Sequence, residues 1–160
     1  MSNMLSENFN IIPLIEPQDH QSAGIDGDSF HCGKVNHFAI IVQFGELTAN
    51  SIMSLYSGAT AGTKTTQESF RYRLADSELK TATGDLYGAW TTIAAGAGLT
   101  LTAASYEDFT VIIEMDSDEM TVDQPWVTLE IDSTASELFV SAVAVATPRH
   151  MGHDTLTLIA

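Results

Sequence analysis

Basic side chains are scarce in this chain. Its 160 residues include 6 Lys and Arg against 21 Asp and Glu, which gives a formal net charge of −15 at pH 7. Proteins that bind nucleic acid directly use clustered Lys and Arg to displace counterions from phosphates. A chain this acidic cannot present such a surface, so the composition argues against a nucleic-acid partner.

The few basic residues are also unevenly placed. Lys64, Arg71, Arg73 and Lys80 fall within one short stretch, whereas residues 81–148 contain neither Lys nor Arg. A basic patch and a long acidic surface on one molecule can steer complementary partners, including copies of itself. The acidity has a simpler alternative explanation, because a high net charge also keeps a protein soluble.

Cysteine and long apolar runs are almost absent as well. Cys32 is the only cysteine, so no internal disulfide can form and packing alone must stabilise the fold. No stretch approaches the roughly 18 apolar residues of a membrane-spanning helix. The N-terminal MSNMLSENFN lacks the basic and apolar regions of a secretory signal. We therefore expect synthesis in the cytoplasm and no membrane association.

Helical periodicity is missing too, and short alternating segments take its place. In VNHFAIIVQF (35–44), alternate apolar side chains fall on one face of a strand, and ESFRYRL (68–74) alternates with Arg71 and Arg73 outward. The further candidate strands are 51–57, 86–93, 99–103, 108–115, 125–132 and 137–146. This series of short strands predicts an all-β fold, a single-domain antiparallel β-sandwich of jelly-roll-like type, over residues 34–146.

Both ends of the chain are expected to extend beyond this domain. Residues 1–33 read as an irregular N-terminal arm, because Pro13 interrupts the apolar run FNIIPLIEP and turn residues follow. Residues 147–160 read as a C-terminal tail that ends in the apolar TLTLIA. The candidate interface residues are the apolar side chains of these extensions and the outward arginines: Phe9, Ile11, Ile12, Leu14, Ile15, Arg71, Arg73, Leu156 and Leu158.

Two loops invite comparison with ligand-binding motifs. GATAGTKT (58–65) lacks the glycine that a phosphate-binding P-loop needs before its lysine, and a strand follows instead of a helix. The acidic segment 116–123 fails the EF-hand pattern, since Thr121 and Val127 replace its glycine and its bidentate Glu. We expect a hairpin loop and a polar turn, the latter with a single helical turn capped by Asp116. A different type of metal site at this turn stays open.

The residue pattern supports no reaction. His31 and Cys32 are adjacent, so in an extended segment their side chains point to opposite sides and cannot pair as base and nucleophile. His150 and His153 have metal-ligand spacing only on a helix or tight turn, which the tail does not show. We therefore predict that the chain is not an enzyme and uses no cofactor, and we assign no metal-ligand residues.

The aromatic residues offer one alternative of a different class. Trp90 and Trp126 are expected in the core, but an aromatic platform can instead line a sugar-binding face. A carbohydrate-binding β-sandwich module is therefore kept as an alternative function.

The last third of the domain carries a resemblance to a known family. The stretch FTVIIEMDSDEMTVDQPWVTLEIDSTASELFVSAVAVATPRH (109–150) resembles the C-terminal half of small head-associated structural proteins of tailed bacteriophages. The shared pattern is an aliphatic strand that ends in an acidic turn, a strand that begins with Trp, and a small-residue strand that closes with Pro-Arg. It covers about a quarter of the chain.

The resemblance implies a head decoration or cement protein. Such a subunit would bind the major capsid protein on the outer surface of the virion, stabilise the lattice, and associate with its own copies, commonly as a homotrimer. Another virion part, such as a head-completion or tail subunit, is the alternative within the same class.

Overall fold

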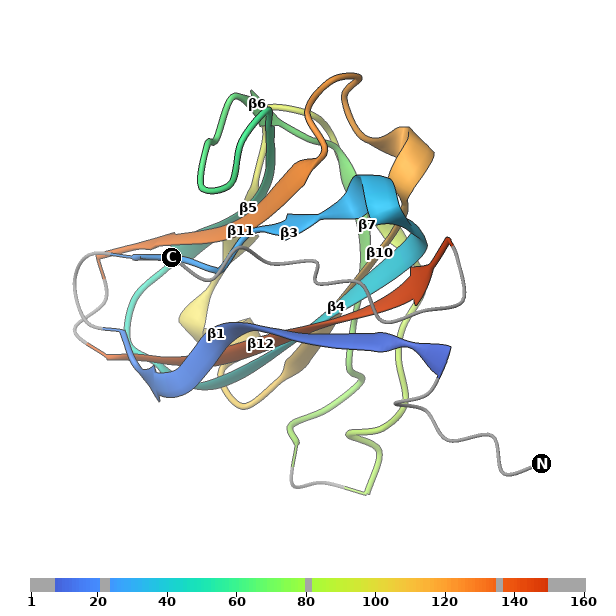
Figure 1. Cartoon of the computed structure of the whole chain (residues 1–160). Helices are drawn as coiled ribbons and strands as arrows, with labels where there is room; N and C mark the ends of the chain where they lie inside the picture. Colours follow the sequence, from blue (N-terminus) through green and yellow to red (C-terminus); the bar gives the residue numbers. More distant parts are fainter. Residues whose placement is uncertain (1–7, 21–23, 80–81, 135–136, 150–160) are drawn as a thin grey trace.

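Two antiparallel sheets form the protein (Figure 1). The computed structural model describes residues 8–20, 24–79, 82–134 and 137–149. The first sheet contains, in spatial order, β1 (Asn10–Asp19), β12 (Leu138–Pro148), β4 (Val35–Leu47), β10 (Thr110–Asp116), β7 (Phe70–Leu74) and β8 (Thr91–Ile93). The second contains β2 (Ile25–Asp26), β11 (Trp126–Ser133), β5 (Ser51–Gly58) and β6 (Thr66–Gln67), with β3 (Phe30–His31) also paired to β11 and β9 (Leu99–Leu101) to β5.

Three helical elements have both ends within the described residues, and each is a single turn. They are η1 (Cys32–Lys34), α2 (Ala103–Tyr106) and η2 (Ser117–Glu119). The sequence offers no apolar stripe of helical period, so no longer helix would have a face to bury.

The strand order is that of a jelly roll. The chain passes repeatedly from one sheet to the other. β1 and β4 lie in the first sheet, and β2 and β5 lie in the second. Near the end of the chain, β10 and β12 lie in the first sheet and β11, between them in sequence, lies in the second. The last strand, β12, therefore lies between β1 and β4, and β11 lies between β2 and β5. The all-β sandwich expected from the sequence is confirmed, including its jelly-roll-like character.

One hydrophobic core fills the space between the sheets. In β4 the alternation starting at Phe38 places its side chain and those of Ile40, Val42 and Phe44 inward, each with at most 1% of its surface exposed. Leu55 of β5 and other side chains of the second sheet belong to the same cluster. Full burial of each such side chain stabilises the fold by about 1.5–3 kcal/mol.

The N-terminal segment departs from the prediction of an irregular arm. Residues Asn10–Asp19 form β1, which pairs antiparallel along β12 from Asn10 opposite Ala146 to Asp19 opposite Phe139. β1 is the edge strand of its sheet, so the missing N–H of Pro13 deprives no neighbouring strand of a hydrogen bond. Register shifts after Pro13 accommodate the second proline, Pro17. The prediction of an arm over residues 1–33 is therefore wrong for this strand, and the sandwich begins near residue 10.

The burial of β1 also corrects part of the predicted interface. Ile12, Leu14 and Ile15 are 4–6% exposed and belong to the chain's own core, so they are not free to contact a neighbour. Ile11 faces outward and is 49% exposed. At the other end, β12 reaches Pro148, and the predicted interface residues Leu156 and Leu158 lie outside the described residues.

Candidate docking surface

The outward face of the first sheet is unusually apolar. The strand registers place Pro13, Val143, Ile41, Ile112 and Arg73 side by side in one row across β1, β12, β4, β10 and β7. The side chains on either side of this row are buried in β1, β12, β4 and β10, and those beside Arg73 in β7 pack partly buried against the core, so the row points away from the core. All of its members except the last are apolar.

A second outward row lies next to it. It runs from Ile11 through Val145 and Ala39 to Glu114 and Arg71. We define the apolar face as the apolar members of the two rows: Ile11, Pro13, Ala39, Ile41, Ile112, Val143 and Val145. An antiparallel sheet with one solvated face normally shows polar side chains there, so a contiguous apolar area marks an interaction surface.

A shallow hollow of about 240 Å³ continues this surface at the end of the sheet. Phe139, which is 43% exposed, and Leu79, which is 40% exposed, line it together with Pro17 and Gly45. Leu79 reaches this place because the segment after β7 folds back, with the Leu79 N–H donating to the carbonyl oxygen of Asp108 at 2.7 Å. The hollow is open and apolar, which suits a partner's side chain better than a small polar ligand.

Arg73 is the last residue of the outward row, and its guanidinium lies over two aromatic rings. Its guanidinium carbon lies 4.5 Å from the ring centroid of Trp90 and 5.6 Å from that of Tyr87. The Arg73 Nε is buried and has no hydrogen-bond partner, while Trp90 remains 43% exposed. We call Arg73, Tyr87 and Trp90 the Arg73 anchor. The three residue types are those enriched where binding energy concentrates in protein interfaces.

The other predicted arginine is occupied within the chain. Arg71 Nη2 donates to Glu119 Oε2 at 2.9 Å. The same carboxylate oxygen accepts the Asp116 N–H at 3.0 Å, which completes the cap of η2. The helical turn capped by Asp116 is thus confirmed, and its carboxylates are engaged in holding the turn and binding Arg71.

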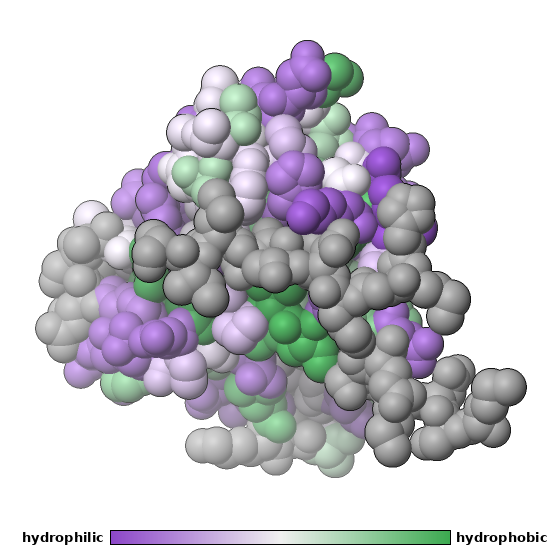
Figure 2. Space-filling view, viewed as in Figure 1, coloured by the Kyte–Doolittle hydropathy of each residue, from purple (hydrophilic) through white to green (hydrophobic). Residues whose placement is uncertain are grey.

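The outward face of the second sheet is polar and covered by the chain itself (Figure 2). The loop between β5 and β6 lies against it, because the Lys64 Nζ donates to Asp26 at 2.8 Å and also to Glu130, and the Gly62 N–H donates to Ser29 Oγ at 2.9 Å. Burial opposes the charge of Lys64, but the two carboxylates outweigh it and raise the pKa of this amine. The two outer faces of the sandwich are therefore chemically different.

The loop of residues 58–65 has no phosphate-binding geometry. It connects two strands, β5 and β6, and its lysine is held by carboxylates of the same chain. A P-loop requires a helix N-terminus directly after the loop. The expected hairpin loop is the observed structure.

The neighbourhood of Cys32 is not arranged for nucleophilic chemistry. Burial raises the pKa of the Cys32 thiol to about 11, so at neutral pH the thiol keeps its proton. The His31 ring packs edge-on against Trp126, with ring centroids 5.1 Å apart, and burial lowers the pKa of this imidazole. Trp126 is thus engaged in packing, in contrast to Trp90.

A buried carboxylate near this end of the sandwich is structural. Glu68 is 7% exposed and accepts hydrogen bonds from Ser57 Oγ and from the Thr121 N–H, the latter at 3.1 Å. These bonds tie the β6–β7 connection to the segment before β11. Within the ranges that the structure describes, no group of three or more His, Cys, Asp or Glu could hold a metal ion. His150 and His153 lie outside those ranges.

Comparisons with known proteins do not assign the chain to a group. No family model, no curated protein and no solved structure matches it. In the described part of the chain, none of the helices has the length and apolar character needed to span a membrane.

Part of the apolar face could be predicted from the sequence. The doubled isoleucines at 40–41 and 112–113 and the Val and Ala pattern of 140–146 show apolar residues on both faces of their strands. The Arg73 anchor could not be predicted, because Tyr87 and Trp90 lie in an irregular segment after β7. That segment has no periodic sequence pattern from which its path could be inferred.

Proposed function

We propose that this chain is a virion structural protein, a decoration or cement subunit that binds the outer surface of a tailed-phage capsid through its apolar face. The observation that carries the proposal is the contrast between the two outer faces. One sheet presents the apolar face, and the other is polar and covered by its own loop. A jelly roll with one adhesive face can attach to a lattice while its other face remains in solvent.

The size and chemistry of the surface are compatible with this role. Stable protein interfaces bury about 1,200–2,000 Å² in total and combine an apolar centre with a polar rim. The rim beside the apolar face carries Glu114 and Asp116, and His37 donates to the latter at 2.8 Å. With a net charge of −15, the protein favours a partner whose contacting surface is basic. The proposed partners are the major capsid protein and sister copies of the chain, with the virion surface as its location.

A matched pair of substitutions tests the proposal. Ile41→Lys places a charge in the centre of the apolar face, whereas Ile52→Lys places one on the outward face of the second sheet, where Ile52 is 46% exposed. Both variants should fold, because neither side chain lies in the core between the sheets: Ile41 is half-buried on the outward face of β4, and Ile52 is exposed. Capsids of the phage that encodes the chain, stripped of this protein, are mixed with each variant and sedimented.

The expected result is a loss of binding by Ile41→Lys of roughly 30-fold or more, since disruption at the centre of an interface costs about 2 kcal/mol or more. Ile52→Lys should bind like the unmodified chain. Equal binding by both variants would reject the assigned face, and absence of binding by the unmodified chain would reject the capsid role. A bound amount far below that of the major capsid protein would indicate a head-completion or tail subunit instead.

A second candidate function rests on the exposed aromatic side chain. Trp90 is 43% exposed and, like Tyr87, lies against the guanidinium of Arg73, and an exposed indole ring can also stack on a sugar ring. A glycan array probed with the unmodified chain and with Trp90→Ala distinguishes the two functions. Binding to a defined glycan that disappears in Trp90→Ala would favour the carbohydrate-binding module.

A further inference from the structure

A rigid projecting turn lies far from the Arg73 anchor. Val122 is 81% exposed, the highest value among the large hydrophobic side chains that the structure describes, and Asp123 follows it with φ of 64°. We call residues 121–124 the Val122 turn.

Hydrogen bonds hold this turn from both sides. The Thr121 N–H donates to buried Glu68 at 3.1 Å, the Gln124 N–H donates to the Thr121 carbonyl at 3.1 Å, and Gln124 Oε1 accepts from Ser57 Oγ at 3.0 Å. The turn is therefore preorganised. A partner that binds it loses less free energy in ordering it than it would with a flexible loop.

The Arg73 anchor lacks a carboxylate partner, and the Val122 turn presents a carboxylate. Lys64 and Arg71 form ion pairs with carboxylates of the chain, but Arg73 has no carboxylate partner among the described residues and its buried Nε has no acceptor. This is unexpected in a protein with 21 acidic residues. The terminal nitrogens of Arg73 are not among the buried unpaired atoms, so a carboxylate from a partner can reach them and pair with the uncompensated charge.

We infer that the Val122 turn of one copy binds the Arg73 anchor of a second copy. The Asp123 carboxylate of the first copy pairs with the guanidinium of Arg73, and the Val122 side chain packs on the exposed part of Trp90. A planar guanidinium fixed on an aromatic ring favours a carboxylate in its own plane, which gives the contact its direction. The turn supplies both an apolar tip and an adjacent carboxylate, which match the exposed ring and the uncompensated cation.

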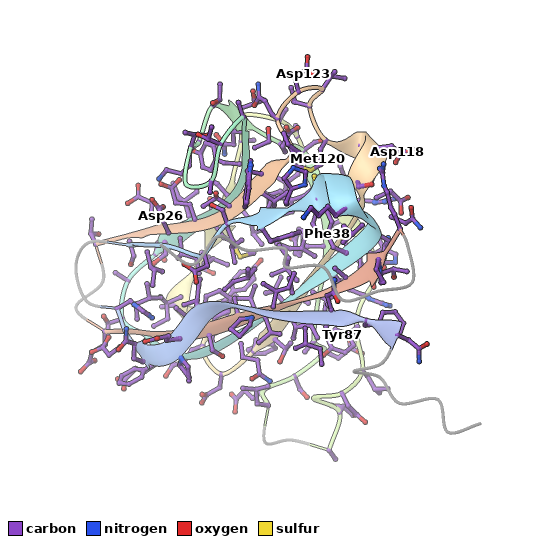
Figure 3. All side chains as sticks on the ribbon, viewed as in Figure 1. Asp26, Phe38, Tyr87, Asp118, Met120 and Asp123 are labelled. Atoms are coloured by element: carbon purple, nitrogen blue, oxygen red, sulfur yellow. The ribbon has the colours of Figure 1, made fainter. Side chains whose placement is uncertain are left out.

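The two surfaces lie on different parts of the molecule. Figure 3 shows Asp123 at the top of the molecule and Tyr87 in its lower half, one on the connection before β11 and the other on the segment after β7. One copy therefore cannot satisfy its own anchor. A contact between two different surfaces of identical chains is heterologous and repeats, so it builds a closed ring or a chain of copies. This contact goes beyond the capsid binding proposed above and does not depend on it.

The high net charge opposes association but does not prevent it. At 0.15 M salt the screening length is about 8 Å, so repulsion between distant acidic groups is strongly reduced. The Arg73 to Asp123 pair acts over a shorter distance and next to an apolar ring, where screening is weaker. Association should therefore be weak at low salt and observable near physiological salt.

Sedimentation velocity of the full-length chain at 0.15 M salt, over a concentration series, tests the contact. The unmodified chain should form species larger than a monomer. Arg73→Gln and Asp123→Asn should each weaken this association by about tenfold or more, as expected for loss of a hydrogen bond to a charged group. Asparagine tolerates the positive φ at position 123, and Asp118→Asn, an exposed acidic neighbour, is the matched control that should associate normally. Circular dichroism verifies that each variant is folded.

Mixing the two defective variants gives the decisive result. Arg73→Gln retains an intact turn and Asp123→Asn retains an intact anchor, so a 1:1 mixture should form heterodimers and nothing larger. A monomeric unmodified chain, association unchanged in both variants, or a mixture that stays monomeric would each overturn the inference. Capsid binding measured on the same variants separates the two proposals, because a monomeric variant that still binds capsids leaves the apolar face in place.

Discussion

Leu14 and Ile11 lie on the same edge strand and face opposite sides of it, so they offer a sharp test of whether β1 belongs to the fold. Leu14 is 6% exposed and packs in the core between the sheets, whereas Ile11 is 49% exposed on the apolar face. Leu14→Ala removes buried methyl groups and leaves a cavity that the flanking strands fill only in part. Such substitutions cost about 2–5 kcal/mol. Ile11→Ala leaves no cavity and should cost less than about 1 kcal/mol.

Urea unfolding monitored by tryptophan fluorescence measures both values. A total free energy of unfolding of about 5–15 kcal/mol makes the Leu14→Ala loss a large fraction of the stability. The thermal midpoint should fall by about 2–4 °C for each kcal/mol lost in a domain of this size. If Leu14→Ala and Ile11→Ala destabilise the protein equally and slightly, β1 is a loosely attached arm and the reasoning about its burial fails. An unchanged denaturant slope in both variants verifies that the same amount of surface unfolds.

Two further predictions concern buried polar groups. Glu68→Ala leaves the Thr121 N–H without its acceptor, while the Ser57 hydroxyl retains Gln124 Oε1, so the free energy of unfolding should fall by about 1–3 kcal/mol. The exposed Glu107→Ala should change it little, and equal urea midpoints for the two variants would show that Glu68 contributes nothing. Cys32 should make stability depend on alkaline pH. Its pKa is raised by burial from 9.0 to about 11, so the unfolded chain loses this proton first and the free energy of unfolding falls as the pH rises from 9 toward 11. Cys32→Ala should flatten the pH profile over that window, and a profile of the same slope in both proteins would contradict the assigned cause.

The sequence predicted the strands that alternate cleanly and the way they pack. Phe38, Ile40, Val42 and Phe44 occupy the inward positions that their spacing required, and β10 and β11 follow the same rule. The strand β1 was missed because Pro13 and Pro17 are signals of irregular structure, and only the neighbours of a strand decide whether its prolines lie at an edge. Edge position depends on topology, which local periodicity does not contain.

Only part of the docking surface could be predicted from the sequence. Apolar residues at both alternating positions of 140–146 indicate two covered faces, and the structure shows which of the two is turned outward. Arg71 and Arg73 have the same outward orientation and adjacent places in the sequence, yet one pairs with Glu119 and the other stacks on Trp90. This difference arises from segments distant in sequence that meet only after folding.

Photo-crosslinking on intact virions tests the central claim most directly. A benzophenone amino acid is introduced at Ile41 on the apolar face, or at Ile52 on the polar sheet as the control, and virions carrying either variant are irradiated. Crosslinks from position 41 to the major capsid protein, with none from position 52, are the predicted result. Crosslinks to the major capsid protein from position 52 and none from position 41 would show that the protein docks by the second sheet, which contradicts docking by the apolar face.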